Sequence, residues 1–310
     1  MFEILFITQI LQPYFNPEFG GVLYSKFQKD LDTNHIISEF SFEFVMKGAI
    51  DPYFIFYGIF PITEKGIELE EAYSKTLTLP FEILIGKFKS RFTRLNTFHP
   101  HFYDFPELPQ MYEYLTFDHK NHSHFHEVEN HKDKGVNGIG IGISYIFPFK
   151  IFIEPGIEIF KDKENNFYNY LSYLHFSNEI PFSTTLWMST YMGLKKDTVK
   201  WVGIEIVLKR IKPGEERLKG LLITGGYFQD AKRHFNSFYF DFVYKFMPRW
   251  RLGYRFDLLE EENKSIRKNI IMIDFSPTEF SRFRLSYEVK EKKIFFETNF
   301  SVGPHGAHPF

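Results

Sequence analysis

The histidines of this chain are concentrated in residues 93–135, which hold 7 of the 12. Three of them alternate in the segment His122-Ser123-His124-Phe125-His126. Imidazole is a common ligand for transition metals, and carboxylates such as Glu127 and Glu129 can complete a site. The sequence therefore predicts labile binding of Zn²⁺, Ni²⁺ or Cu²⁺ within 119–131. The alternative is a solvated polar loop that binds no metal, because His-rich tracts have no fixed ligand spacing. The predicted ligands are His119, His122, His124 and His126.

Lysines and arginines recur at alternate positions in segments that are rich in aromatic residues. Residues 93–135 carry seven acidic side chains against four basic ones. An acidic loop that faced a basic wall across a lumen would create a transverse field, which orients and filters small charged solutes. Local pairing of the cations with Glu68, Glu70, Asp257 and Glu288 is the alternative. The predicted pore-lining residues are Lys87, Lys89, Arg91, Arg251, Arg255, Arg282 and Arg284.

The elements that would position these groups are β-strands, because apolar side chains recur at every second position. In Trp250–Leu258 the apolar residues alternate with Arg251, Gly253, Arg255 and Asp257, whereas a helix would space its buried residues three and four apart. The 40 Phe, 18 Tyr and 3 Trp among 310 residues are too many rings for one soluble interior. The expected strands lie near 17–28, 35–47, 49–60, 67–79, 81–92, 136–147, 150–160, 167–178, 181–192, 198–210, 217–229, 234–247, 249–260, 267–276, 280–290 and 293–303.

The connections between these strands are of two alternating kinds. Tight turns carry proline, as in Phe147-Pro148-Phe149 and Met247-Pro248-Arg249, and longer polar loops such as 161–166 and 260–265 separate them. Barrels of the outer membrane have this arrangement, with short turns on the periplasmic side and longer loops outside. A soluble β-sandwich is the alternative, but a face with five successive aromatic residues argues against it.

Composition narrows the class of protein further. The 37 Lys and Arg balance 39 Asp and Glu, so no basic field is available to bind nucleic acid. The chain has no cysteine, which excludes disulfides and thiol nucleophiles, and it lacks the apolar run of about 18 residues that a spanning helix needs. We predict an all-β fold, a transmembrane antiparallel β-barrel of about 16 strands (range about 12–16) in the outer membrane of a Gram-negative bacterium. The barrel domain would span 16–310 with its long loop at 93–135, and residues 1–15 are interpreted as a signal remnant or an N-terminal tail.

Several segments carry a resemblance to a known family. They are Asn16-Pro17-Glu18-Phe19, Glu70-Glu71-Ala72-Tyr73, Gly86–Phe92, Arg94-Leu95-Asn96, His99-Pro100-His101, Glu279–Leu285 and Gly303–Phe310. Together they resemble bacterial outer-membrane barrels labelled zinc-regulated TonB-dependent receptors or putative porins. The resemblance implies a barrel in the outer membrane and a structural role for His99 and His101. The terminal Phe310 would be recognised by the barrel-assembly machinery.

The function expected from these observations is a porin-like channel for passive diffusion of small hydrophilic solutes or ions. The alternatives are an outer-membrane receptor that takes up a divalent metal such as zinc through the His-rich loop, and a barrel for surface adhesion or recognition. No catalytic residue and no required cofactor are predicted, because Ser172 with His175 and Ser237 with His234 have no recognisable motif around them. Expected partners are outer-membrane lipid, the diffusing solutes or metal ions and further copies in a homotrimer, but not nucleic acid.

Overall fold

The computed structural model describes residues 17–76, 80–114, 136–161, 168–195, 198–211, 219–230, 235–261 and 264–303. Most of these residues lie in β-strands. The strands are β1 (Glu18–Asp30), β2 (Ile36–Ala49), β3 (Phe54–Thr63), β4 (Gly66–Ile67), β5 (Glu71–Thr76), β6 (Phe81–Lys89), β7 (Asn137–Tyr145), β8 (Phe152–Lys161), β9 (Tyr168–Ile180), β10 (Thr184–Lys195), β11 (Thr198–Arg210), β12 (Gly220–Asp230), β13 (Phe235–Met247), β14 (Trp250–Glu261), β15 (Lys264–Thr278), β16 (Ser281–Glu288) and β17 (Lys293–Val302). Three short helical segments follow β6: α2 (Arg94–Thr97), η1 (Pro100–Phe102) and α3 (Met111–Tyr114).

The strands form one antiparallel sheet that closes on itself. β1 pairs with β2 on one side and with the last strand, β17, on the other, from Gly21 opposite Val302 to Asp30 opposite Lys293. β4 and β5 both pair with β3, so the two-residue β4 is one extra strand beside a wall of sixteen. The predicted all-β, antiparallel barrel of about 16 strands is therefore confirmed. Among the described residues, no helix is long and apolar enough to cross a membrane.

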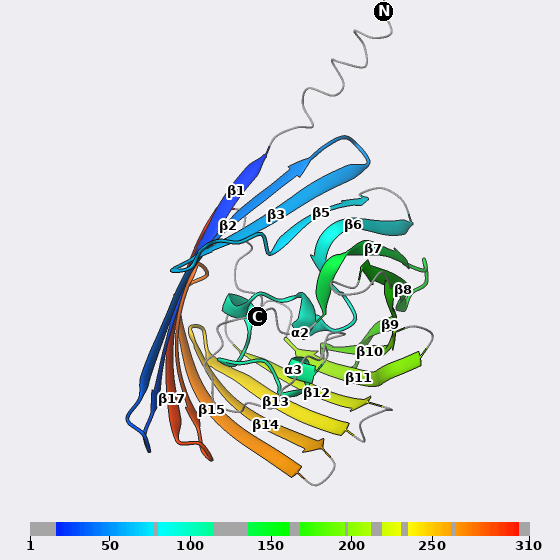
Figure 1. Cartoon of the computed structure of the whole chain (residues 1–310). Coiled ribbons are helices and arrows are strands. Elements are labelled where there is room, and N and C mark those ends of the chain that lie inside the picture. The colour runs from blue at the N-terminus through cyan, green and yellow to red at the C-terminus, as the bar shows by residue number, and fades with distance from the viewer. Residues whose placement is uncertain are drawn as a thin grey trace, which may run out of the picture.

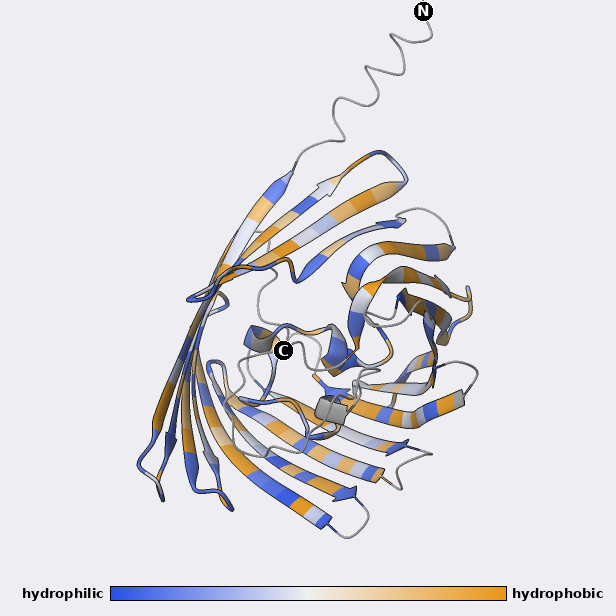
Figure 2. Ribbon diagram, viewed as in Figure 1, coloured by the Kyte–Doolittle hydropathy of each residue, from blue (hydrophilic) through white to orange (hydrophobic). Residues whose placement is uncertain are grey.

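The period-two pattern places apolar side chains outside and polar side chains inside the barrel. In β14, Leu252 is 46% exposed on the outer face, whereas Arg251 and Arg255 are 7% and 2% exposed. Figure 2 shows the resulting alternation of hydrophobic and hydrophilic residues along the strands. Lipid would cover the outer face, which explains why a chain so rich in aromatic residues needs no large soluble core.

Residues 90–114, called the inner loop here, lie within the barrel. In Figure 1, α2 and α3 are surrounded by the ring of strands. Asn96 closes the base of the loop, because its side-chain nitrogen donates to the carbonyls of Ser90 (2.6 Å) and Val136 (3.0 Å) and its oxygen accepts from the Val136 amide (3.0 Å). Thr93 caps α2 by accepting a hydrogen bond from the Asn96 amide. One buried asparagine thus holds together the two chain segments that enter and leave the loop.

The buried apolar core lies between the inner loop and the barrel wall. Phe92 packs against Tyr191 in an edge-to-face arrangement with ring centroids 4.9 Å apart, and against Trp201 at 5.7 Å. Tyr112 of α3 is completely buried in the same cluster. The other members include Leu95, Leu108 and Met111 from the loop and Tyr173, Phe228, Phe235, Tyr239 and Leu259 from β9 to β14. The hydrophobic effect therefore holds the inner loop on this side of the lumen.

Candidate functional site

Arginines of the last strands bind the backbone of the inner loop. Arg282 donates to the carbonyl of His101, Arg284 to that of Tyr103 and Arg255 to that of Glu107. The side-chain amide of Asn299 also donates to the His101 carbonyl, at 2.7 Å. These donors come from β14, β16 and β17, which lie on one side of the barrel with β15 between β14 and β16. The lumen face of β14 to β17 therefore fixes the position of the inner loop.

Carboxylates of the same wall neutralise these arginines. Asp274 of β15 is fully buried and lies 2.7 Å from Arg251, 3.6 Å from Arg284 and 3.7 Å from Arg282. Arg284 is also 3.0 Å from Glu297. Burial makes each charge dependent on its partner, because an uncompensated ion inside a protein costs several kcal/mol, about 3–5. The basic residues of this wall thus pair locally as well as with the loop.

The opposite wall is acidic, and basic residues at the start of the inner loop contact it. Arg91 forms an ion pair with Glu82 at 2.5 Å and donates to Ser144 at 2.8 Å. The amide of Arg94 donates to Glu205 (2.9 Å), whose other oxygen accepts from Tyr239 (2.6 Å). Further along the loop, Asp104 faces the basic wall, 3.4 Å from Arg251. The loop therefore crosses between two walls of opposite charge and complements both.

A cluster of carboxylates surrounds His99 where the inner loop meets β2 and β5. The Nδ1 atom of His99 is 3.4 Å from a carboxylate oxygen of Glu43 and 3.4 Å from one of Glu70, and its Nε2 is 2.9 Å from Glu71. Lys89 approaches the same group, 2.7 Å from Glu70 and 3.4 Å from His99 Nδ1. One oxygen each of Glu43 and Glu70 and a nitrogen of His99 lie within 4.8 Å of one another, an arrangement that can hold a metal ion.

The two histidines of this cluster have opposite pKa shifts. Burial and the Lys89 ammonium lower the pKa of His99, but the carboxylates of Glu43 and Glu70 outweigh them and raise it to about 10. Burial lowers the pKa of His101 from its usual value, even though Glu43 is 3.3 Å from its Nδ1. The local charge is therefore concentrated on His99, while His101 packs beside it with ring centroids 5.8 Å apart.

The structure separates the predicted pore-lining residues into two groups. Arg251, Arg255, Arg282 and Arg284 face the lumen, and Arg91 and Lys89 lie inside it as described above. Lys87 differs, because it pairs with Ala72 and Ile139, and Ile139 is 63% exposed in the outward row. Its side chain donates to the carbonyl of Leu69. The pairing of β6 with β7 is continuous from Phe81 to Lys89, so Lys87 follows Ile85 in the outward row, and the expected basic ladder of Lys87, Lys89 and Arg91 is not formed.

Other predicted residues lie outside the described residues. They are His119, His122, His124 and His126 with the rest of 119–131, Phe310 and residues 1–15. The sequence interpretation also missed several residues of the site, namely Glu43, Asn96, Asp274 and Asp241, which pairs with Arg255 at 2.6 Å. Each acidic member occupies an inward position of a strand, which alternation alone could have indicated, but its partner on another strand could not be read from spacing.

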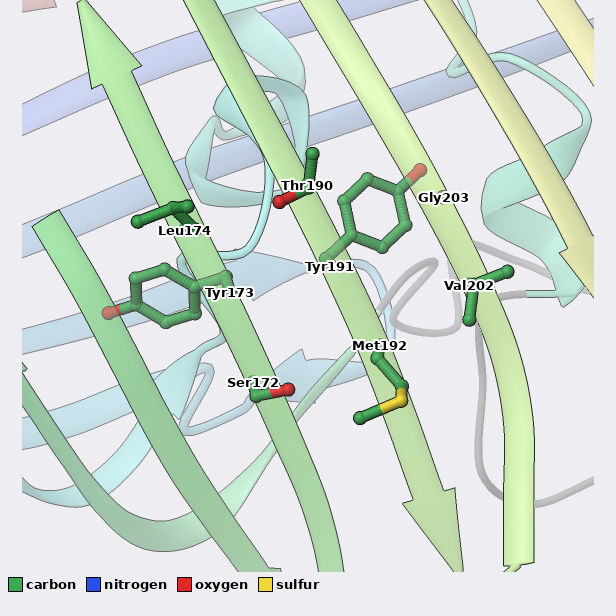
Figure 3. A pocket seen from close by; sticks show the side chains of 8 residues that line it. All are labelled: Ser172, Tyr173, Leu174, Thr190, Tyr191, Met192, Val202 and Gly203. Carbon is green, nitrogen blue, oxygen red and sulfur yellow. The ribbon is translucent and has the colours of Figure 1, made fainter. Parts of the chain in front are cut away.

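A hollow also lies in the barrel wall, outside the lumen. It has a volume of about 400 Å³ and lies at β9 to β11 (Figure 3). Gly203 makes room for the ring of Tyr191, because a Cβ there would lie 2.4 Å from that ring. Leu174 and Val202, which also line the hollow, are 44% and 38% exposed in the outward row. No charged side chain is among the residues that line this hollow, so it is not the candidate site.

Comparisons with known proteins agree with this geometry. No family model matches the chain. An uncharacterized protein of Aquifex aeolicus (strain VF5) is 25% identical over 339 residues, covering 86% of this chain and 69% of that protein. The in-vitro folded OmpT of Vibrio cholerae, an outer membrane protein in its trimer form, is similar with a TM-score of 0.60 at 9% identity, covering 93% of this chain and 99% of that chain.

Two further solved structures have the same architecture. The outer membrane channel DcaP of Acinetobacter baumannii has a TM-score of 0.57 at 8% identity, covering 94% of this chain and 98% of that chain. A mutant of the Rh. blastica porin has a TM-score of 0.54 at 9% identity, with coverage of 93% and 99%. At such identities the likeness shows the fold: this chain is a porin-like β-barrel of the bacterial outer membrane. The TonB-dependent receptor label is not supported, because those transporters have a plugged barrel of about 22 strands.

Proposed function

We propose that this barrel is a passive channel for small hydrophilic solutes or ions, narrowed by the inner loop. The observation that carries the proposal is the loop's position between a basic and an acidic wall, with Arg91 paired with Glu82 on one side and Asp104 with Arg251 on the other. Width and fixed charge would then select the solute without a chemical step. The similar solved structures that are described as porins or channels support the same function.

Liposome swelling tests this proposal with uncharged sugars of increasing size. The folded protein should admit the small sugars and exclude larger ones. Replacement of Asn96 by alanine should raise the size limit, because it releases the base of the inner loop. The matched control is Asn236→Ala, since Asn236 accepts a hydrogen bond from Tyr227 at an exposed position. Liposomes that contain folded protein and do not swell in any sugar would contradict the channel.

Metal uptake through 119–131 and surface adhesion are the other functions. If the protein is a channel that is narrowed by the inner loop, deletion of 119–131 should leave liposome swelling unchanged, because the contacts that anchor the loop lie within residues 90–114. Loss of zinc uptake in that variant would favour the receptor. Association of three copies is also a proposal, supported by the trimer form of the similar Vibrio cholerae protein, and chemical cross-linking in detergent would test it.

A further inference from the structure

We propose that Glu43, Glu70 and His99 form a binding site for a divalent transition-metal cation of the Zn²⁺ class inside the lumen. The three residues come from β2, from the residue before β5 and from the inner loop. Bound metal would therefore join the loop to β2 and to the start of β5, in addition to its arginine contacts with β14 and β16. This site is distinct from the histidines of 119–131 and does not depend on the channel function.

The spacing of the ligand atoms fits such an ion. Zinc binds nitrogen and oxygen ligands at about 2.0–2.2 Å in tetrahedral geometry, which places neighbouring ligand atoms about 3.3–3.6 Å apart. His99 Nδ1 lies 3.4 Å from Glu43 and 3.4 Å from Glu70. All three ligand atoms lie within 4.8 Å of one another, so little rearrangement would be needed.

The orientation of His99 is fixed by its other ring nitrogen. The Nε2 atom lies 2.9 Å from a carboxylate oxygen of Glu71. Metal-binding histidines commonly donate their second N–H to a carboxylate in this way, which sets the ring orientation and makes the ligating nitrogen more basic. With Nε2–H donated to Glu71, displacement of the Nδ1 proton by a metal ion would leave the Nδ1 lone pair directed at the ion between Glu43 and Glu70.

Independent support comes from Glu43. Its side chain is 7% exposed, and its Oε2 atom has no hydrogen-bond donor among the described residues. A buried carboxylate oxygen without a donor is costly, since its desolvation is not compensated. A metal ion at the centre of the cluster would supply the missing partner.

The charge of the cluster also fits a divalent cation. Glu43, Glu70 and Glu71 contribute three negative charges, and Lys89, 2.7 Å from Glu70, returns one positive charge. A bound metal ion would displace the proton from His99 Nδ1, and the ligands would then carry a balance of two negative charges. A cavity of about 150 Å³, lined in part by Glu71, Lys89 and His99, adjoins the cluster and gives an ion room to approach.

The Lys89 ammonium competes with a metal ion for the carboxylates around His99, so a variant that lacks this ammonium tests the proposal directly. Zinc and cobalt binding would be measured on full-length protein in detergent, by equilibrium dialysis with metal analysis and by the visible spectrum of Co²⁺. The background variant carries asparagine at His119, His122, His124, His126 and His131, so that metal bound at these positions does not add to the measured value. Heat-modifiable migration on gels would establish that each variant is folded.

We expect one metal ion per chain in this background. His99→Gln and Glu43→Gln should weaken binding at least 100-fold, and Glu71→Gln about 10–100-fold. The Lys89→Met variant should bind the metal ion about 10-fold more tightly, because the competing ammonium is removed. A cluster that only forms ion pairs would not gain metal affinity from this change. His175→Gln is the matched control, because His175 is a buried lumen histidine with the single carboxylate Glu154 3.4 Å away, and it should leave affinity unchanged.

The outcomes separate the site from an ordinary ion-pair cluster. Absence of bound Zn²⁺ and Co²⁺ in folded background protein would overturn the proposal, as would equal affinity of the background and its folded His99→Gln variant. If His99→Gln does not fold, the Lys89→Met and Glu71→Gln variants decide. Opposite changes in their affinities support the site, and unchanged affinities overturn it. Liposome swelling of the same proteins reports separately on the channel.

Discussion

At the scale of single residues, buried charges are the least replaceable part of this lumen. Asp274 is the counter-charge that three buried arginines share, and all three also contact the inner loop, through Asp104 and the carbonyls of His101 and Tyr103. Exposed pairs are different, because water screens them and their side chains lose entropy on pairing. Residue-level effects should therefore follow burial rather than the number of ion pairs.

Replacement of Asp274 by asparagine tests this dependence on burial. The substitution leaves three buried arginines without their shared counter-charge, and we expect a loss of about 3–5 kcal/mol in the free energy of unfolding. Urea-induced unfolding in detergent micelles measures the change. Asp32→Asn is the control, since Asp32 pairs with Lys292 at an exposed position; equal loss in the two variants would contradict the account.

The pH dependence of loop docking can be predicted from Asp104. Burial raises the pKa of its carboxyl, but Arg94, Arg251 and Arg284 outweigh burial and hold the pKa below its ordinary value. Because the folded-state pKa is depressed, the stabilisation is fully present above the unfolded pKa of about 3.9 and is lost as pH falls through the folded-state pKa. Unfolding free energy should thus fall more steeply below about pH 4 in the wild type than in Asp104→Asn, and identical slopes would show that Asp104 does not hold the loop.

At the scale of elements, the alternation of apolar and polar residues predicted the strands but not the position of the inner loop inside them. The strands β14, β16 and β17 could be predicted because successive side chains face lipid and the polar lumen in turn, so that apolar and polar residues alternate. The fold of the inner loop could not, since its anchors Asn96 and Phe92 act through partners distant in sequence. The His99 cluster has the same origin: its carboxylates come from β2 and from the start of β5, and only closure of the barrel brings them together.

Gly86 is a position in β6 where the backbone conformation requires glycine. Its φ of +136° lies in the region that favours glycine, and a Cβ there would be 2.2 Å from the Ala72 carbonyl oxygen. The pairing of β6 with β7 continues through Gly86 to Lys89 without a shift, so glycine is required here by the backbone conformation and the close approach of β5.

We expect Gly86→Ala to lower the free energy of unfolding by about 1–3 kcal/mol or more, through backbone strain and the clash with β5. The control is Gly225→Ala, where the nearest atom to an added Cβ is 3.7 Å away. Urea unfolding in micelles compares the two variants. An equal effect in both would mean that loss of glycine flexibility, rather than strain at Gly86, determines the result.

At the scale of the whole molecule, the barrel is a wall of sixteen strands and one extra strand around a loop that contacts both charged sides of the lumen. The apolar outer face is suited to lipid, and the interior is suited to hold charged groups in fixed positions. A passive channel needs both properties: a stable wall, and a constriction whose charges do not move.

Single-channel conductance in a planar bilayer tests the central claim most directly. Full-length protein, shown to be folded by heat-modifiable migration, should give stable open steps with a current proportional to voltage, and Asn96→Ala should give larger steps because the inner loop is released. Folded protein that gives no steps, in the wild type and in Asn96→Ala alike, would contradict the channel.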